Sequence, residues 1–159
     1  MPSITPNLWF DTEAEEAAAY YTSVFPNSRI VNVSRYTGAG PRPEGEVMTV
    51  DFELDGRRFT GINGGPEFRF SEAVSFLISC ETQEDVDHYW ERLTDGGEEG
   101  PCGWCKDRYG LSWQVVPKLL DELVAGADRE RAQRAMEAMF KMRKLDIAAL
   151  RAAADGVTA

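Results

Sequence analysis

Histidine and cysteine are scarce in this chain of 159 residues, which has one histidine, His88, and three cysteines, Cys80, Cys102 and Cys105. Imidazole serves most protein metal sites and the Ser–His and Cys–His catalytic pairs, so a single histidine excludes many hydrolytic and metal-dependent mechanisms. An odd number of cysteines, two of them close together, does not form a secreted disulfide framework. His88 itself is expected to be a solvated or half-buried helix residue.

Long apolar runs are also missing. No segment approaches the ~20 apolar residues that span a bilayer, and the N-terminus has neither the basic start nor the apolar stretch of a signal peptide. We therefore expect a cytoplasmic protein. Acidic residues outnumber basic ones by 27 to 17, which gives a formal net charge of -10. Because that charge repels phosphate backbones and anionic lipid, neither nucleic acid nor membrane is predicted as a partner.

What the chain does contain is an ordinary globular composition, with 43% hydrophobic and 28% charged residues. A strand is predicted over residues 4–10. Thr12 and Glu15 have the spacing of a capping box, which predicts a helix that ends before Pro26. Further strands are predicted over residues 29–36, 47–54 and 58–62. The strand at 47–54 alternates apolar and polar residues, and Asp55-Gly56 indicates a hairpin turn.

The same order of elements then begins again. A strand is predicted over residues 74–80, and Thr82 with Asp85 opens a second helix that Gly96-Gly97 ends. Extended segments follow at 102–106 and 111–116. At an offset of 69 residues the two helices share several residue types, and the sequence around Gly56-x-x-Phe59 resembles Gly110-x-x-Trp113. We interpret the chain as a duplicated module.

The tail after Pro117 has no counterpart in the first half. Residues 118–124 suit one or two helical turns, and residues 128–143 have apolar positions at helical spacing. Asp146 is expected to cap a last short helix. The methionine-rich tail is predicted to close over a pocket, to support a dimer, or simply to cover its own sheet.

Several stretches of the sequence together resemble a known family. They are residues 4–11 (ITPNLWFD), 14–17 (AEEA), 20–21 (YY), 24–27 (VFPN), 52–56 (FELDG), 63–66 (NGGP), 102–104 (CGW) and 106–114 (KDRYGLSWQ). The chain thereby resembles the PhnB-like group, also described as 3-demethylubiquinone-9 3-methyltransferase, of the vicinal oxygen chelate superfamily. That superfamily includes glyoxalase I, bleomycin resistance proteins and extradiol dioxygenases.

The resemblance implies an α+β fold of two βαβββ modules with a C-terminal helical extension. The paired modules would occupy residues 1–117, as about 3–66 and 72–117, and the extension residues 118–159. In such folds each half-sheet curves around a cavity with its helix outside, and many members are homodimers. We therefore expect a homodimer.

Metal binding in this superfamily uses His, Glu or Gln from the first and last strands of each module. At the corresponding positions this chain offers Asn7 and Gln114, two neutral amides. A divalent ion requires more basic ligands than these, so we predict neither a metal nor another cofactor. The Cys102-Gly-Trp-Cys105 spacing is that of a redox dithiol, but its predicted hairpin lacks the helix N-terminus that would activate a thiol.

The candidate site residues follow from the strands that would face the cavity. If the protein is an enzyme, its candidate catalytic residues are Asp51 or Cys102, acting with Gln114 to move protons at a carbonyl-like centre. The predicted ligand-binding residues are Asn7, Trp9, Thr49, Thr60, Ser75, Trp104 and Trp113. The tryptophans favour a small apolar or aromatic molecule as the partner, with the alternative that they are core residues.

Three hypotheses about function remain open. The first is a metal-free small-molecule-binding protein. The second is an enzyme on the same scaffold, of lyase or isomerase type or the methyltransferase of the family's description. The sequence lacks the glycine-rich loop and following acidic residue of the common S-adenosylmethionine fold. The third is a structural or regulatory protein that binds a partner through its C-terminal helices.

Overall fold

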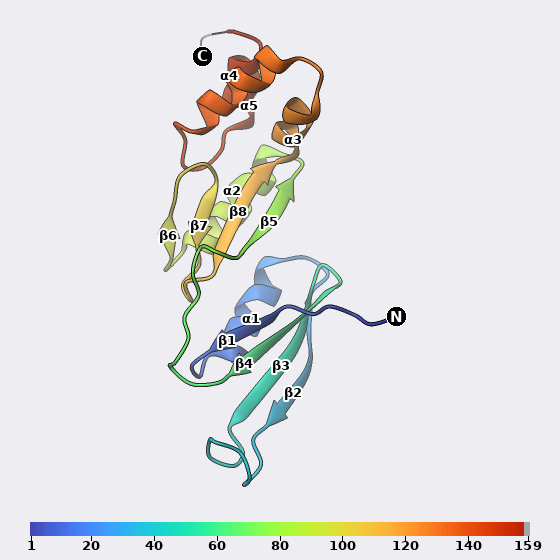
Figure 1. Ribbon diagram of the computed structural model, residues 1–159, viewed down its shortest axis with the longest axis vertical. Coiled ribbons are helices and arrows are strands. Elements are labelled where there is room, and N and C mark those ends of the chain that lie inside the picture. Colours follow the sequence, from blue (N-terminus) through green and yellow to red (C-terminus); the bar gives the residue numbers. More distant parts are fainter. Residues whose placement is uncertain (158–159) are drawn as a thin grey trace. The chain divides into compact units, whose positions relative to one another are not determined.

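The computed structural model describes residues 1–157, which form two compact units, Met1–Phe70 and a second unit that begins at Ser71 (Figure 1). Each unit contains one four-stranded sheet. The strand orders are β1-β4-β3-β2 in the first unit and β5-β8-β7-β6 in the second. This arrangement, with helices added after the second sheet, confirms the predicted α+β fold of two βαβββ modules and a helical C-terminal segment.

The first unit begins with strand β1 (Asn7–Phe10) and helix α1 (Ala14–Val24), followed by β2 (Arg29–Arg35), β3 (Val47–Leu54) and β4 (Arg57–Asn63). β1 pairs in parallel with β4, and the other pairs are antiparallel. The predicted alternation is confirmed in β3, where Val50, Phe52 and Leu54 are buried. α1 packs on this apolar side through Tyr21, whose ring stacks on that of Phe52 with centroids 6.1 Å apart.

The start of α1 differs from the prediction. Thr12 is not its N-cap, and the Thr12–Glu15 capping box is wrong: the cap position is Glu13, without a side-chain cap hydrogen bond. The amide of Ala14 instead donates to Asn63 Oδ1 at 2.8 Å, from the end of β4. A distant strand thus supplies the acceptor that a local side chain was expected to provide.

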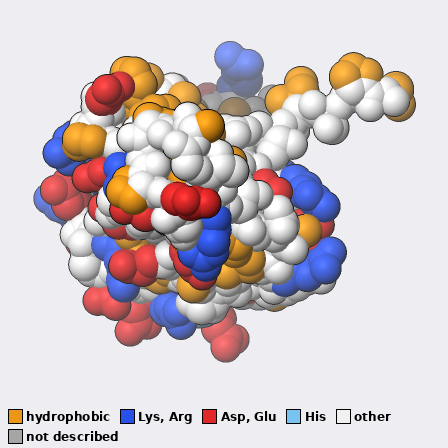
Figure 2. Space-filling view, turned by 90° about the horizontal axis from the view of Figure 1, so that it is seen from below, with side chains coloured by type: hydrophobic (Ala, Val, Ile, Leu, Met, Phe, Trp, Pro, Cys, Tyr) orange, Lys and Arg blue, Asp and Glu red, His pale blue; other side chains and the backbone are white. Residues whose placement is uncertain are grey.

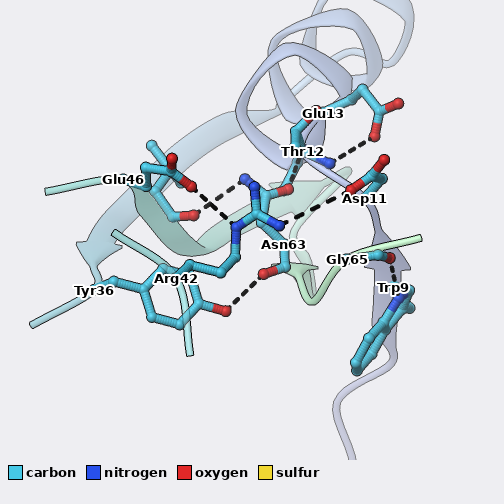
Figure 3. Close-up of polar contacts among 11 residues, drawn as sticks. Trp9, Asp11, Thr12, Glu13, Tyr36, Arg42, Glu46, Asn63 and Gly65 are labelled. Atoms are coloured by element: carbon cyan, nitrogen blue, oxygen red, sulfur yellow. Dashed lines mark hydrogen bonds and ion pairs between the residues drawn. The ribbon is translucent and has the colours of Figure 1, made fainter. Parts of the chain in front are cut away.

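Asn63 is 4% exposed and joins three segments of the first unit (Figure 3). Its Nδ2 donates to the carbonyl of Val47 at 3.1 Å, and its own carbonyl accepts from the Tyr36 hydroxyl at 2.6 Å. Beside this network Arg42, in the loop between β2 and β3, donates to Glu46 at 3.0 Å and lies 4.0 Å from Asp11. These contacts hold the loop against the end of β1.

The second unit repeats the order with β5 (Ser75–Cys80), α2 (Gln83–Thr94), β6 (Glu98–Glu99), β7 (Trp104–Lys106) and β8 (Ser112–Pro117). The capping box is confirmed here, because Thr82 and Asp85 exchange both hydrogen bonds at 3.1 Å. β6 was not predicted. It has only two residues, which is too short for an alternating pattern to be seen.

The duplication extends to the turn that enters the last strand of each sheet. Gly56 precedes β4 with φ 75°, and Gly110 precedes β8 with φ 85°. Such angles favour glycine, which has no Cβ to clash. Phe59 and Trp113, three residues after these glycines, are both buried. The sequence similarity around the two glycines is therefore a structural equivalence.

Three helices follow the second sheet: α3 (Lys118–Ala125), α4 (Arg129–Met139) and α5 (Ile147–Ala154). Asp128 caps α4 and Asp146 caps α5, the latter as predicted. α4 ends before the predicted residue 143. The helices share an apolar cluster with the end of β8, made of Val116, Leu120, Leu123, Ala135, Leu145, Leu150 and Ala154. In Figure 1 they gather beyond one end of the strands β5 and β8.

The helical tail packs on the end of β8 and belongs to the same unit as the second sheet. The boundary predicted between residues 117 and 118 therefore stays a prediction. The end of the predicted extension, residues 158–159, lies outside the described residues. None of the helices in the described part of the chain is both long and apolar enough to cross a membrane. On the face shown in Figure 2, acidic and basic side chains are interspersed.

Replacing Asn63 by alanine should lower the free energy of unfolding by about 2–3 kcal/mol, because the amide of Ala14 and the carbonyl of Val47 would lose their partner in a buried place. Urea denaturation followed by circular dichroism measures this. The control is Asn32→Ala, at an exposed asparagine, where the expected cost is below about 0.5 kcal/mol. Equal costs for the two variants would contradict the role given to Asn63.

Candidate functional site

The two faces of the second sheet have different surroundings. Along one row, Phe76, Trp113 and Cys105 are register partners on the side where α2 packs, and Trp113 and Cys105 are buried. The next row, on the opposite face, contains Leu77, Gln114 and Trp104. Leu77 is 52% exposed although it lies in mid-strand. This face of the second sheet is therefore open within its own unit.

A hollow of about 720 Å³ lies on the open face. Its floor comes from β5, β7 and β8, one side from residues 98–102, and another from α3 and the end of α4. Its lining residues are Glu72, Leu77, Glu98, Glu99, Gly100, Pro101, Cys102, Trp104, Cys105, Lys106, Ser112, Gln114, Val116, Leu120, Asp121, Met139 and Phe140. The volume is in the range of small-molecule sites, and much of the lining is apolar.

Two polar side chains of β8 lie within this hollow and have different partners. Gln114 donates from Nε2 to the hydroxyl of Ser75 at 2.9 Å. Ser112, which is 1% exposed, has a hydroxyl for which the described residues supply no hydrogen-bond partner. An unpaired buried hydroxyl is costly in a folded protein. Ser112 thus marks a place where a ligand atom or a water would gain a hydrogen bond.

Charged groups surround the apolar floor. Lys106 forms an ion pair with Glu72, and this contact lowers the pKa of the Glu72 carboxyl and raises the pKa of the Lys106 ammonium. Glu98 is the register partner of Lys106 across β6 and β7. The carboxylate of Glu99 accepts from the indole of Trp90 at 3.1 Å. Asp121 is exposed on the first turn of α3.

The three cysteines differ in their surroundings. All three are free, and burial raises the pKa of Cys105 to about 12, with a further contribution from Asp107 and Glu99. Burial likewise raises the pKa of Cys80 to about 12. Cys102, which is partly exposed, lies in a turn with φ 57° whose amide donates to the carbonyl of Met142 at 2.9 Å. The tail therefore positions Cys102 in the lining.

The first unit has its own open face, and most of the candidates from that half lie there. Asn7, Thr60 and Asp51 are register partners in one row across β1, β4 and β3. The Thr60 hydroxyl donates to Asp51 Oδ1 at 2.7 Å. The following row on the same face contains Trp9 and Thr49, with Ile62 between them. The indole of Trp9 donates to the carbonyl of Gly65 at 2.9 Å, so its orientation is held (Figure 3).

The structure thus places the predicted site residues in two groups. Cys102, Trp104 and Gln114 line the hollow of the second unit, and Ser75 contacts Gln114. Of the two catalytic alternatives, Cys102 lies with Gln114 in the lining of one hollow, whereas Asp51 belongs to the first unit. Trp113 lies on the opposite face from the hollow, with its indole donating to Asp107 at 2.9 Å. This position favours the alternative that Trp113 is a core residue and not a ligand-binding one.

Leu77 and Ser112 were missed as lining residues, whereas Met139 and Phe140 belong to the tail for which closing over a pocket was one of three predicted roles. A signal for Leu77 was present, because Phe76, Leu77 and Ile78 are consecutive apolar residues in one strand. Such a run places an apolar side chain on each face of the sheet. No sequence pattern showed that the end of α4 would reach this face.

The side chains at the superfamily's metal positions do not fit a divalent ion. On the open faces, the first and last strands present Asn7 beside Thr60 in one unit, and Ser75 and Leu77 beside Gln114 in the other. Two amides, two hydroxyls and a hydrocarbon make a weak donor set. Across residues 1–157, no group of three or more His, Cys, Asp or Glu side chains is placed to hold a metal.

Comparison with a family model places residues 2–116 in the family described as 3-demethylubiquinone-9 3-methyltransferase. No curated protein matches the chain. Among solved structures, a PhnB protein from Bacillus cereus is similar, with 37% identity, a TM-score of 0.65, and coverage of 73% of this chain and 99% of its own.

Two more distant structures show the fold alone. A protein from Pseudomonas aeruginosa has 16% identity and a TM-score of 0.60, and the comparison covers 74% of this chain and 98% of that one. The fosfomycin resistance protein FosX from Listeria monocytogenes has 15% identity and a TM-score of 0.54, with coverage of 77% and 97%. The paired-module architecture is thus shared with the glyoxalase/bleomycin resistance fold.

Alkylation with iodoacetamide at pH 8 should modify Cys102 in the native protein and leave Cys80 and Cys105 intact, since burial covers these two thiols and keeps them protonated. Peptide mass spectrometry identifies the modified residues. In urea all three should react. Labelling of Cys105 as fast as Cys102 in the native protein would contradict the placement of Cys105 in the interior.

Replacing Ser112 by alanine should raise the free energy of unfolding of the unliganded protein by about 1 kcal/mol, because it removes a buried hydroxyl that has no partner. Thermal or urea unfolding measures the change. Ser75→Ala is the matched control at the register partner of Ser112. It should be destabilising, since the Ser75 hydroxyl accepts from Gln114. A loss of stability in Ser112→Ala would mean that this hydroxyl is already paired.

Proposed function

The chain belongs to the family described as 3-demethylubiquinone-9 3-methyltransferase, and from this premise we propose that it binds a small, largely apolar molecule without a metal. The hollow on the open face of the second sheet carries this proposal. It combines a suitable volume with an apolar floor and a few polar groups. Apolar or aromatic molecules of about ten to twenty heavy atoms are compatible with that volume.

The exposure of the floor supports binding at this place. Leu77 is 52% exposed, and Phe140, after the end of α4, is 64% exposed. Apolar side chains that gather around one hollow gain free energy when a ligand removes them from water. Gln114, Ser75 and the unpaired Ser112 add the convergent polar groups that orient a ligand.

The donor chemistry supports a metal-free site. The open-face positions of the first and last strands hold Asn7, Thr60, Ser75, Leu77 and Gln114, and none of these side chains is a basic metal ligand. The function proposed is therefore binding rather than metal-dependent turnover. The raised pKa of Cys105 likewise favours binding over dithiol chemistry.

The C-terminal helices contribute to the same site. Their apolar residues pack on one another and on Val116, and Met139 and Phe140 line the hollow. We propose that the tail shapes the ligand site in preference to binding a separate protein. A homodimer, frequent in this superfamily, also remains a proposal for this chain.

Titration with the neutral fluorescent probe N-phenyl-1-naphthylamine should show saturable binding in the micromolar range, about -8 kcal/mol, that is unchanged by prior treatment with EDTA. Leu77→Gln should weaken binding about fivefold or more, because it places an amide on the apolar floor. The control is Val124→Gln, at a similarly exposed residue of α3 that does not line the hollow.

Three results would contradict the proposed function. They are an absence of saturable binding, an equal loss in the two variants, and a stoichiometric divalent metal whose removal abolishes binding. Metal analysis of the purified protein by mass spectrometry supplies the last of these measurements.

A further inference from the structure

We propose that the natural ligand of the hollow is an organic cation, a molecule with an apolar or aromatic body and a protonated or quaternary amine. This inference rests on the proposed function, since it names the class of ligand for the same site. It comes from the charges around the apolar floor, from the aromatic residues within it, and from the unpaired hydroxyl of Ser112.

The charges of the lining are strongly unequal. Of the described residues that line the hollow, four are acidic and one is basic. The acidic residues are Glu72, Glu98, Glu99 and Asp121, and the basic residue is Lys106. All four are exposed, but the carboxylate of Glu99 accepts from the indole of Trp90 on α2, which packs on the opposite face of the sheet. The acidic charges at the rim of the hollow are therefore those of Glu72, Glu98 and Asp121.

The positive charge of Lys106 is already engaged. Its ammonium forms the ion pair with Glu72, and Glu98 lies opposite it across β6 and β7. Arg143, outside the lining, donates to the backbone carbonyl of Glu99 and not to its carboxylate. The rim therefore keeps an excess of negative charge, which attracts a cation and repels a carboxylate or phosphate.

The floor suits the body of such a ligand. Leu77, Val116 and Met139 provide apolar contacts, and Trp104, which is only partly buried, and Phe140 provide aromatic rings. A cation near the face of an aromatic ring gains a further attraction, strongest for tryptophan. The same hollow thus offers both parts of an amphiphilic cation a favourable contact.

Ser112 is an independent indication that a ligand belongs here. Its hydroxyl is buried on the hollow's side of β8 and has no partner among the described residues. Since neighbouring atoms cover this hydroxyl, a polar atom of the ligand would satisfy it only after those neighbours shift. The acidic rim, the apolar floor and the Ser112 hydroxyl together favour a cation that has an additional polar atom.

Three probes of equal size test the charge preference: a naphthylmethyl trimethylammonium salt, naphthylmethyl isopropyl ether, and naphthylmethyl sulfonate. Their affinities are obtained by displacement of N-phenyl-1-naphthylamine from the full-length protein. We expect the cation to bind about tenfold more tightly than the ether, and the sulfonate most weakly. The advantage of the cation should shrink between 0.05 and 0.5 M salt, because salt screens exposed charges.

The double variant Glu98→Gln/Asp121→Asn isolates the rim charges. It should reduce the advantage of the cation over the ether to about twofold or less, mainly through a lower affinity for the cation. Glu91→Gln is the control, because Glu91 is exposed on α2, outside the lining of the hollow. This control should retain the full preference.

Equal affinities for the three probes, or a preference for the cation that survives the double variant, would overturn the inference while the proposed binding function stands. Tighter binding of the sulfonate would overturn it in the same way. If none of the probes, nor N-phenyl-1-naphthylamine itself, binds, the proposed function fails as well, so the two failures are distinguishable.

Discussion

One helix covers only one face of each four-stranded sheet, and the rest of the structure depends on this constraint. α1 takes the apolar side of the first sheet, through contacts such as Tyr21 on Phe52. α2 takes the corresponding side of the second sheet, where Trp113 and Cys105 are buried. Because side chains alternate along a strand, the other face of each sheet remains available for function.

The two modules share this plan and differ in what they place on the open face. In the first, polar residues in register satisfy one another, as the Thr60 hydroxyl does with Asp51. In the second, Leu77 and Trp104 supply an apolar floor, and the tail adds Met139 and Phe140. The two modules are thus equivalent scaffolds whose open faces carry different side chains.

Prediction from the sequence was most successful where the determining contacts are local. The bounds of β3 and the capping box of Thr82 follow from neighbouring residues, and both are confirmed. Thr12 shows the opposite case, since its predicted capping role is replaced by Asn63, some fifty residues away in the chain. Trp113 was a pocket candidate by residue type, whereas the register of β8 turns it toward α2.

The sequence by itself determined the repeated order of strands and helices, except for the two-residue β6, and the negative charge of the chain. Periodicity, turn residues and composition depend on residues close together in the chain. Only the tertiary structure decided that Ser112 is buried without a partner, and that the end of α4 meets Leu77 and Trp104 around one hollow. These relations depend on which segments pack together, and packing between distant residues leaves no periodic pattern in the chain.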